Sequence, residues 1–406
     1  MLNNVESVVA KQNLCCSCGL CASYCHQGAI AYRVDNLGFY IPSVDKNKCN
    51  NCGLCVKCCP GKNDLKQYKQ QDETYLYGYS LDEEMHMNAS SGGIATELLC
   101  YLIENKIVDY VTCVTNRTST NLPEQILTND VALIRASRTS KYCPVKWNNI
   151  LSKIDAVEGS IAVVALPCQV NSLKKYYQHK KSNIKYYISL FCNHTPSLNA
   201  AIYLANSIEP GGKLLSITNR GGGFPGYMKV TISVGEDSSI RKVLLPYRKT
   251  MTAGYGKFFK NMRCIVCNDP FAKHADIVMG DSYFLQDTDQ KGTTFCIIRN
   301  KEIENIMYQM KTKGIIDFKI GPDESIQKKA FKLLFNRERI FEKNVEILKK
   351  SGIVINTSIQ TSNNLPTIMD ILRFKREVIL RSLGRYHFLW KYLTKYKNIK
   401  KLMIEL

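Results

Sequence analysis

The sequence predicts an α+β protein with three successive parts: a small cysteine-rich unit, an α/β body with a mixed sheet, and a basic helical tail. Three observations support this prediction. A group of four cysteines occurs twice between residues 15 and 59. Strand-like and helix-like apolar segments then alternate, which is typical of an α/β sheet. Beyond Gly321, helical patterns and basic residues dominate.

The composition is that of a globular chain with room for more than one core. Its 406 residues are enough for two or three domains. Hydrophobic residues make up 45% of the chain and charged residues 22%, which is ordinary globular usage. The segment Met1–Leu14 lacks the apolar run of a secretion signal, and no stretch approaches the roughly 18 apolar residues of a spanning helix. We therefore expect a cytoplasmic protein whose 18 cysteines are reduced or metal-bound.

The first part contains an internal repeat of the motif C-x2-C-x2-C-x3-C. Its second copy begins 34 positions after the first, and both copies contain Cys-Gly-Leu-Cys. The cysteines are Cys15, Cys18, Cys21 and Cys25 in the first copy, and Cys49, Cys52, Cys55 and Cys59 in the second. This repetition predicts a duplicated small domain, and the polar run Gly61–Asp72 indicates the linker that leaves it.

The motif spacing indicates two 4Fe-4S clusters. In the bacterial pattern three closely spaced thiolates bind one cluster, and the fourth cysteine of each motif binds the other cluster. The predicted ligand sets are therefore Cys15, Cys18, Cys21 and Cys59 for one cluster, and Cys49, Cys52, Cys55 and Cys25 for the other. Structural zinc is the alternative, but it typically uses two C-x2-C pairs separated by a dozen or more residues. Pro60 follows the second motif as the pattern expects, whereas His26 stands at that place in the first.

The other cysteines divide into several groups. Cys168 and Cys192 each follow a predicted strand, where an α/β sheet places functional residues. Together with Cys264 and Cys267 they make a third complete ligand set for a further 4Fe-4S cluster, the alternative being buried free thiols. Cys16 and Cys58 fall outside both motifs and are interpreted as spare thiols. Core packing is expected for Cys100, Cys113 and Cys296, and Cys143 is left open.

The body is predicted from alternating segments. We expect a helix at Gly93–Lys106 and another from Gln169, and strands at Val108–Val114, Ile161–Leu166 and Lys185–Phe191. The segments Lys229–Val234 and Lys242–Leu245 predict an antiparallel hairpin, which makes the sheet mixed.

A short run of small residues opens the first of these helices. The run Ser90, Ser91, Gly92 and Gly93 presents hydroxyl and free N–H groups at a positive helix end, where a phosphate fits. The alternative is a plain helix cap.

The motifs of this chain, taken in their order along the sequence, resemble those of the beta subunit family of coenzyme F420-reducing hydrogenase and dehydrogenase. The resemblance covers roughly Cys15 to Gly321, and Gly280–Phe284 departs from the family's Gly-Asp-Phe-Trp segment. It rests on the double cluster motif, Ser90–Gly93, Ser140–Tyr142, Pro167–Gln169, Phe191–Cys192, Cys264–Cys267, Ala275–Ile277 and Gly280–Asp281.

The resemblance implies domains, cofactors and a function. It divides the chain into a bacterial-type double 4Fe-4S ferredoxin-like domain at 1–62, the N- and C-terminal parts of a flavin-type domain at 75–150 and 155–321, and a basic tail at 322–406. It implies FAD or FMN, which we expect at Ser90–Gly93. The implied function is an iron-sulfur flavoprotein oxidoreductase that passes electrons from a low-potential donor such as ferredoxin to a flavin and then to a small-molecule acceptor. Bacterial relatives in polysaccharide gene clusters favour a role in surface polysaccharide biosynthesis. The alternative is an electron-transfer subunit that serves a catalytic partner on another chain.

The tail carries most of the positive charge. From Ile326 to Leu406 there are 18 Lys or Arg and 6 Asp or Glu, which is +12 of the chain's net +20. Near-helical spacing of apolar residues, on the face opposite basic ones, predicts a helix lying on an anionic membrane, at the inner face of the cell membrane. The apolar residues are Ile368, Ile371, Leu372, Ile379 and Leu380, and the basic ones are Arg373, Lys375 and Arg376. The alternatives are core packing and a solvated helical face. Basic and aromatic residues interleave only at Tyr386–Lys400, so we expect no nucleic-acid partner.

Overall fold

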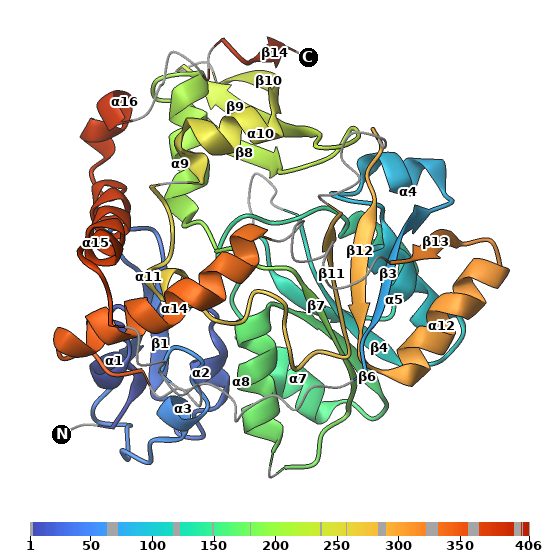
Figure 1. The fold of residues 1–406 in the computed structure, drawn as a ribbon, viewed down its shortest axis with the longest axis horizontal. Helices are drawn as coiled ribbons and strands as arrows, with labels where there is room; N and C mark the ends of the chain where they lie inside the picture. Colours follow the sequence, from blue (N-terminus) through green and yellow to red (C-terminus); the bar gives the residue numbers. More distant parts are fainter. Residues whose placement is uncertain are drawn as a thin grey trace.

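The computed structural model shows an α+β fold around a large mixed sheet, with a cysteine-rich unit at one end and a small sheet at the other (Figure 1). The described residues are 3–62, 72–116, 122–147, 150–178, 180–235, 238–256, 258–282, 290–321, 332–355, 365–393, 399 and 401–405. The central part of the predicted linker and residues 283–284 of the segment Gly280–Phe284 therefore lie outside the described residues.

The cysteine-rich unit has the same backbone in both copies of its motif. Ser17 and Asn51 have φ values of 60° and 61°, and Gly19 and Gly53 have values of 77° and 75°. The unit comprises α1 (Val5–Val8), η1 (Ala10–Gln12), α2 (Leu20–Ser23), the antiparallel pair β1 (Ile30–Val34) and β2 (Tyr40–Val44), and α3 (Leu54–Lys57). The sequence repeat is therefore a structural repeat, because equivalent positions make the same turn into equivalent short helices.

The large sheet has eight strands in the order β13-β3-β12-β11-β7-β6-β4-β5. Its centre, β4-β6-β7-β11, is parallel, whereas the outer pairings are antiparallel. The prediction of a mixed sheet is thus confirmed. The strands are β3 (Thr74–Ser80), β4 (Tyr110–Val114), β5 (Gln125–Thr128), β6 (Ile161–Ala165), β7 (Ile184–Leu190), β11 (Ile277–Asp281), β12 (Thr294–Ile298) and β13 (Ile316–Ile320).

Helices cover both faces of this sheet because alternate strand residues point to opposite sides. On one face, Leu98 and Met307 belong to a core that buries α5 (Ile94–Glu104) and α12 (Lys301–Thr312). On the other face, Leu151 and Leu173 belong to a core that buries α7 (Ile150–Ala156) and α8 (Pro167–Tyr177). The helix α6 (Val131–Ala136) contacts α5, and α4 (Glu83–Asn88) contacts β3. The helices predicted at Gly93–Lys106 and from Gln169 are both present.

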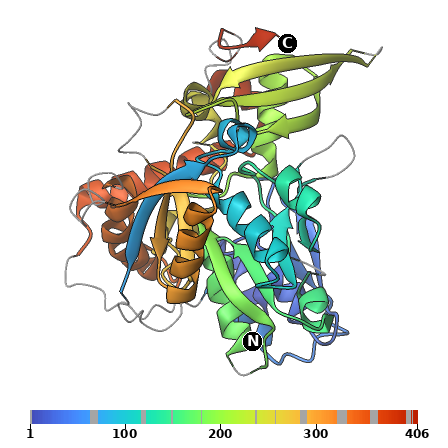
Figure 2. The same cartoon turned by 90° about the vertical axis from the view of Figure 1, so that its right-hand side faces the viewer.

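The predicted hairpin is correct, but it belongs to a second sheet. Strands β9 (Tyr227–Val234) and β10 (Ser239–Pro246) pair antiparallel in a four-stranded sheet with β8 (Lys213–Thr218) and β14 (Ile404–Glu405) (Figure 2). The antiparallel strands that make the large sheet mixed are instead its outer strands. The helix α9 (Leu198–Ile208) packs against the small sheet, and α10 (Tyr247–Thr250), η2 (Met251–Tyr255) and α11 (Met262–Ile265) follow it.

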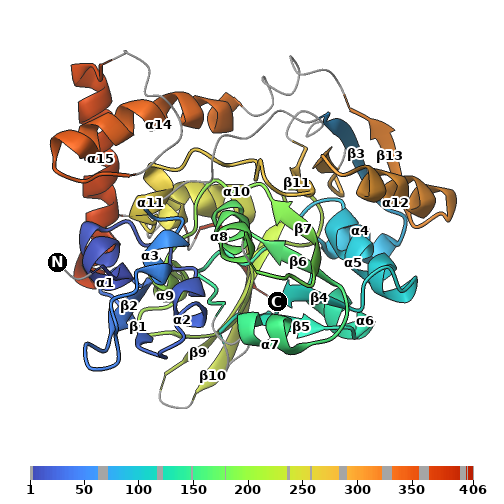
Figure 3. The ribbon, with the colours of Figure 1, turned by 90° about the horizontal axis from the view of Figure 1, so that it is seen from below.

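The tail packs against both ends of the molecule. Phe341 of α14 (Lys332–Lys350) shares a core with Val5 and Leu14, so this helix covers the cysteine-rich unit (Figure 3). Trp390, at the start of α16 (Trp390–Leu393), is buried under the small sheet, and β14 pairs with β10. Between them lie α15 (Ile368–Leu383) and η4 (His387–Leu389). In the described part of the chain, no helix combines the length and apolarity needed to cross a membrane.

Candidate metal and cofactor sites

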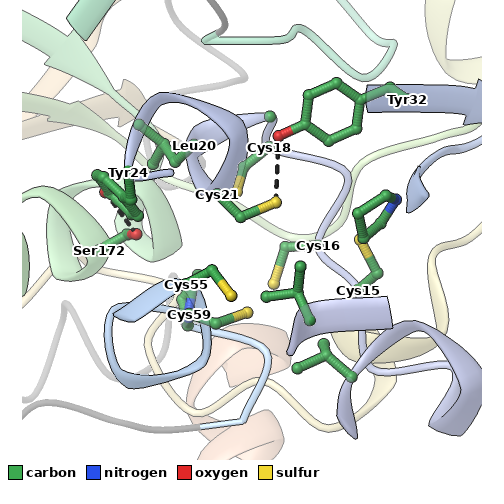
Figure 4. Close-up of a pocket in the computed structure, with 15 residues that line it drawn as sticks. Cys15, Cys16, Cys18, Leu20, Cys21, Tyr24, Tyr32, Cys55, Cys59 and Ser172 are labelled. Atoms are coloured by element: carbon green, nitrogen blue, oxygen red, sulfur yellow. Dashed lines mark hydrogen bonds between the residues drawn. The ribbon is translucent and has the colours of Figure 1, made fainter. Parts of the chain in front are cut away.

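One pocket is lined by six cysteines from both copies of the motif: Cys15, Cys16, Cys18 and Cys21 of the first copy, and Cys55 and Cys59 of the second. Cys15, Cys18 and Cys21 of the first copy face Cys59, the last cysteine of the second copy (Figure 4). These four are one of the two predicted ligand sets. Of the other set, Cys55 interacts electrostatically with Cys52 and Cys25. Cys55 also lines the pocket and interacts electrostatically with Cys21, so these contacts do not separate the two sets, and the crossed assignment stays a prediction.

Backbone N–H groups point at these sulfurs. Ser17 N–H donates to Cys15 Sγ at 3.4 Å, and Ala29 N–H donates to Cys25 Sγ at the same distance. Turns that alternate left- and right-handed conformations expose several N–H groups to one side, which suits a bound anion or iron-sulfur group. Gly19 is required at its turn because a Cβ there would lie 2.8 Å from the backbone N of Trp147.

The thiols of the pocket are buried and close to one another. Burial raises the pKa of Cys21 to about 12, and it also raises the pKa of Cys15, Cys18 and Cys59, with neighbouring thiols adding to each increase. Crowded thiolates are unfavourable without a cation, so a bound metal group would stabilise them and release their protons. Among the described residues, no three or more His, Cys, Asp or Glu side chains are gathered as ligands of a single ion. In a 4Fe-4S cluster each cysteine binds a different iron, and this all-thiol donor set fits such a cluster.

Two tyrosines that the motif analysis missed lie in this pocket. Tyr32 Oη is 3.1 Å from Cys21 Sγ and accepts the N–H of Ala22 at 2.9 Å. Because the hydroxyl accepts from the backbone, its own hydrogen is left for the sulfur. Tyr24 Oη lies 2.8 Å from Ser172 Oγ, which donates to the carbonyl of Cys58 at 2.9 Å and so connects the unit to α8. The sequence gives no signal for either role, since Tyr24 occupies a variable position of the first motif and Tyr32 lies outside both motifs.

The predicted third set is partly brought together by the described contacts. Cys168 lies in the first turn of α8, hydrogen-bonds Cys16, and interacts with Cys192, which follows β7. The Cys16 contact and burial raise the pKa of Cys168. Cys264 lies in α11 and interacts electrostatically with Arg381. The third cluster with Cys168, Cys192, Cys264 and Cys267 stays a prediction.

The interpretation of Cys16 as a spare thiol does not agree with its position in the structure. It lines the pocket of the first ligand set and contacts Cys168 of the third. Its register in the sequence could not reveal this, because the contact joins residues 16 and 168 through the fold. Cys58, also interpreted as a spare thiol, is buried in the core beside α8. Core packing of Cys100, Cys113 and Cys296 is confirmed.

The predicted flavin loop lies between α4 and α5, against the carboxyl-terminal end of β3. Ser90 Oγ accepts the N–H of Ser140 at 2.7 Å, and Ser91 Oγ donates to the carbonyl of Thr293 at 2.8 Å. A Cβ on Gly92 would lie 2.5 Å from the carbonyl oxygen of Gly78, and one on Gly93 would lie 2.9 Å from Met85. Packing against protein atoms therefore already explains both glycines. The hydroxyls of the loop do not cap α5, so the plain-cap alternative does not account for the serines.

A second glycine-rich segment, which the sequence analysis did not single out, packs against this loop. The N–H of Gly223, in the segment Gly221–Gly226, donates to the carbonyl of Met87 at 2.9 Å, which joins the segment to α4, the helix that precedes the loop. Immediately before the segment, Arg220 is buried and forms an ion pair with Asp281, the last residue of β11. The signal in the sequence is the run Arg-Gly-Gly-Gly-Phe-Pro-Gly at residues 220–226.

Two of the predicted ligand cysteines and the partner of Arg220 lie at one edge of the large sheet. Cys168, Cys192 and Asp281 lie at or just beyond the carboxyl ends of the adjacent parallel strands β6, β7 and β11. Ligands of α/β sheets bind outside this edge. These three residues therefore lie along one edge of the sheet.

Comparison with known proteins assigns this fold to a class of oxidoreductase subunits. Residues 75–152 match the N-terminal model, and residues 159–323 the C-terminal model, of the coenzyme F420 hydrogenase/dehydrogenase beta subunit. The chain belongs to this family, which confirms the resemblance noted from its motifs.

Three similar proteins come from archaea. The uncharacterized protein MJ0725 of Methanocaldococcus jannaschii is 27% identical over 288 residues, which are 67% of this chain and 95% of that protein. The coenzyme F420-dependent sulfite reductase of the same organism is 24% identical over 209 residues, 45% of this chain and 31% of that protein. The fold resembles a chain in the F420-reducing [NiFe] hydrogenase complex of Methanosarcina barkeri, with a TM-score of 0.52 and 19% identity over 72% of this chain and 99% of that one.

Proposed function

We propose that this oxidoreductase is an iron-sulfur flavoprotein. It accepts single electrons from a low-potential donor such as a ferredoxin on two N-terminal 4Fe-4S clusters and delivers them, through FAD or FMN, to a small-molecule acceptor. The observation that carries the proposal is the pocket in which cysteines of both motif copies meet.

The contacts of Cys16 support a route from this pocket into the body. Cys16 shares the pocket with the first ligand set and hydrogen-bonds Cys168, which lies beside Cys192 at the carboxyl edge of the sheet. Cys168, Cys192, Cys264 and Cys267 would hold a third 4Fe-4S cluster, which would supply a further electron carrier. Closely spaced clusters favour electron transfer over organic chemistry, which fits a relay.

The chain's residues would bind and orient the flavin. Ser90 and Ser91 are held in place by Ser140 and Thr293, and the N-terminus of α5 lies beside them. A flavin, when bound, supplies the exchange between one-electron and two-electron transfer. An acceptor linked to sugar or lipid, used in surface polysaccharide biosynthesis, is our proposal for the physiological role.

The alternative is an electron-transfer subunit for a catalytic partner on another chain. The likeness to a chain of a multi-subunit hydrogenase complex favours this alternative. Both proposals share the clusters and differ in where the substrate is converted.

Purification of the full chain under anaerobic conditions tests the proposal. Two clusters give about eight irons per chain, and a third gives about twelve. Flavin should be released on denaturation in a fixed ratio to protein. Stoichiometric zinc without iron would refute the proposal. Oxidation of reduced ferredoxin by the lone chain with a small acceptor identifies the enzyme, whereas a requirement for a second protein identifies the subunit.

A further inference from the structure

We propose that Arg220 binds an oxyanion of a ligand, a phosphate or a carboxylate, on the Nε–Nη2 edge of its guanidinium group. This inference deepens the proposed function and rests on it, because the oxyanion belongs either to the flavin or to the acceptor.

The hydrogen bonds of Arg220 leave one edge of the guanidinium group without a partner. Its Nη1 donates to both carboxylate oxygens of Asp281, at 2.9 and 2.7 Å. The Nε and Nη2 atoms are buried and have no hydrogen-bond partner, and the side chain is only 3% exposed. These two atoms form the side-on fork that matches two oxygens of a carboxylate or a phosphate. Buried polar groups normally have partners, so two free donors on one edge point to a ligand.

Aromatic rings fix the plane of this fork. The guanidinium carbon of Arg220 lies 4.8 Å from the ring centre of Tyr247 and 5.3 Å from that of Phe224. Tyr247 is held in turn by a hydrogen bond from its hydroxyl to that of Tyr142 at 3.0 Å. The fork is therefore oriented before a ligand arrives, which reduces the entropy lost on binding.

The charge around the fork favours an anion. Burial lowers the pKa of Arg220, but Asp281 more than compensates, so the pKa is raised and the guanidinium stays charged. Arg248 lies over the ring of Phe224 at 5.6 Å and adds a second positive charge. Asp281 neutralises one of the two.

The fork lies in the neighbourhood of the predicted flavin loop. A Cβ on Gly292 would lie 3.3 Å from the backbone of Ser91 and 3.4 Å from the side chain of Phe224. Gly292 therefore lies between the flavin loop and the segment that follows Arg220. A ligand held at Ser90–Gly93 is therefore a neighbour of the aromatic ring that packs on Arg220. Two sources of the oxyanion follow from this placement: the phosphate of the flavin, or an acidic group of the acceptor.

The variant Arg220→Lys tests the two parallel donors separately from the charge, because lysine keeps a positive charge for Asp281 but cannot present two parallel donors. The double variant Arg220→Gln with Asp281→Asn removes both charges together and avoids an unpaired buried carboxylate. Arg241→Lys is the matched control, since Arg241 pairs with Glu209 and Glu405 on the small sheet. Calorimetry on the full, iron-loaded chain measures binding of riboflavin, FMN and inorganic phosphate.

If the fork binds the flavin phosphate, the wild-type chain prefers FMN to riboflavin by roughly ten- to hundredfold, and both Arg220 variants lose this preference. If it binds the acceptor, the preference is unchanged, but flavin-loaded wild-type protein binds inorganic phosphate and the variants bind it at least about tenfold more weakly. Equal FMN preference and equal phosphate affinity in wild type and variants would overturn the inference. Iron content and total flavin binding of the wild-type chain report separately on the proposed function.

Discussion

The cysteine pocket and the Arg220 site are built in opposite ways. Every predicted ligand of the pocket lies between residues 15 and 59, and matching turns at Gly19 and Gly53 fix their positions locally. The Arg220 site joins Asp281 and Tyr247, residues that only the two sheets bring together. A short motif with fixed spacing therefore reveals the first site from the sequence, whereas the second becomes visible only through unpartnered donors in the fold.

The largest expected effect concerns the crossed ligand sets of the pocket. Because Cys59 faces Cys21 and Cys15, we expect Cys59→Ser and Cys21→Ser to abolish the same cluster, with a loss of up to about four irons per chain. Cys25→Ser should abolish the other cluster. Paramagnetic resonance of the reduced variants distinguishes the two signals. A Cys25→Ser protein that lacks the signal of the Cys15 cluster, while Cys59→Ser retains it, would contradict crossing and make the unit two independent motifs.

How far the sequence predicted these regions depends on how local each feature is. The helix expected at Gly93–Lys106 is observed at Ile94–Glu104, because an amphipathic pattern and a glycine cap are properties of one segment. The hairpin of β9 and β10 was predicted correctly but placed in the wrong sheet, since partner strands cannot be read from its alternation. Arg220 was overlooked because an arginine in a sequence is ordinarily a surface residue, and only its burial against Asp281 sets it apart.

The same difference applies to the tail, where helical spacing predicted an apolar stripe but not which face is buried. Phe374 and Arg381 of α15 are buried, whereas Ile368, Leu372 and Ile379 are 77%, 55% and 58% exposed. The expected separation of apolar and basic faces is therefore wrong in part: Arg373 pairs with Asp370, while Lys375 and Arg376 are exposed on the same helix as the apolar residues. Exposed apolar and basic side chains on one helix suit an anionic lipid surface.

The second prediction tests this surface. Each apolar side chain buried in lipid contributes about 1.5–3 kcal/mol, so Leu372→Ser with Ile379→Ser should weaken binding to anionic vesicles at least about tenfold. Co-sedimentation at low and high salt measures it. Ile240→Ser is the control, because Ile240 is 65% exposed but lies on the small sheet. Equal pelleting of all three proteins would leave the tail as packing alone. Truncation is unsuitable, since it would remove the buried Trp390.

The third prediction compares the two cysteines outside the motifs. Cys16 lies between the pocket and Cys168, whereas Cys58 packs in the core. We expect Cys16→Ser to slow electron transfer from the clusters to the flavin several-fold with iron content unchanged, because it alters the contact that joins the two regions. Cys58→Ala should leave the rate unchanged. Stopped-flow absorbance of flavin reduction by dithionite separates these outcomes, and equal rates would show that electrons take another route.

The smallest expected effect concerns Tyr32, whose hydroxyl lies 3.1 Å from Cys21 Sγ. The N–H of Ala22 occupies the hydroxyl as an acceptor, so with Cys21 as a thiolate ligand the tyrosine donates to sulfur. A hydrogen bond to a cluster sulfur stabilises the more negative, reduced state, and solvent exposure and hydrogen bonds to sulfur set cluster potentials. We therefore expect Tyr32→Phe to lower the reduction potential of the cluster that contains Cys21 by on the order of tens of millivolts.

Tyr24→Phe is the matched control, because it removes a hydroxyl of the same pocket that bonds Ser172 instead of a thiol. Redox titration followed by paramagnetic resonance measures both potentials. If the two variants shift the potential equally, the effect comes from the polarity of the pocket, and the sulfur contact of Tyr32 has no separate role. If only Tyr32→Phe shifts it, a residue outside the repeat tunes one of two otherwise equivalent clusters, and the two halves of the duplicated unit differ in function.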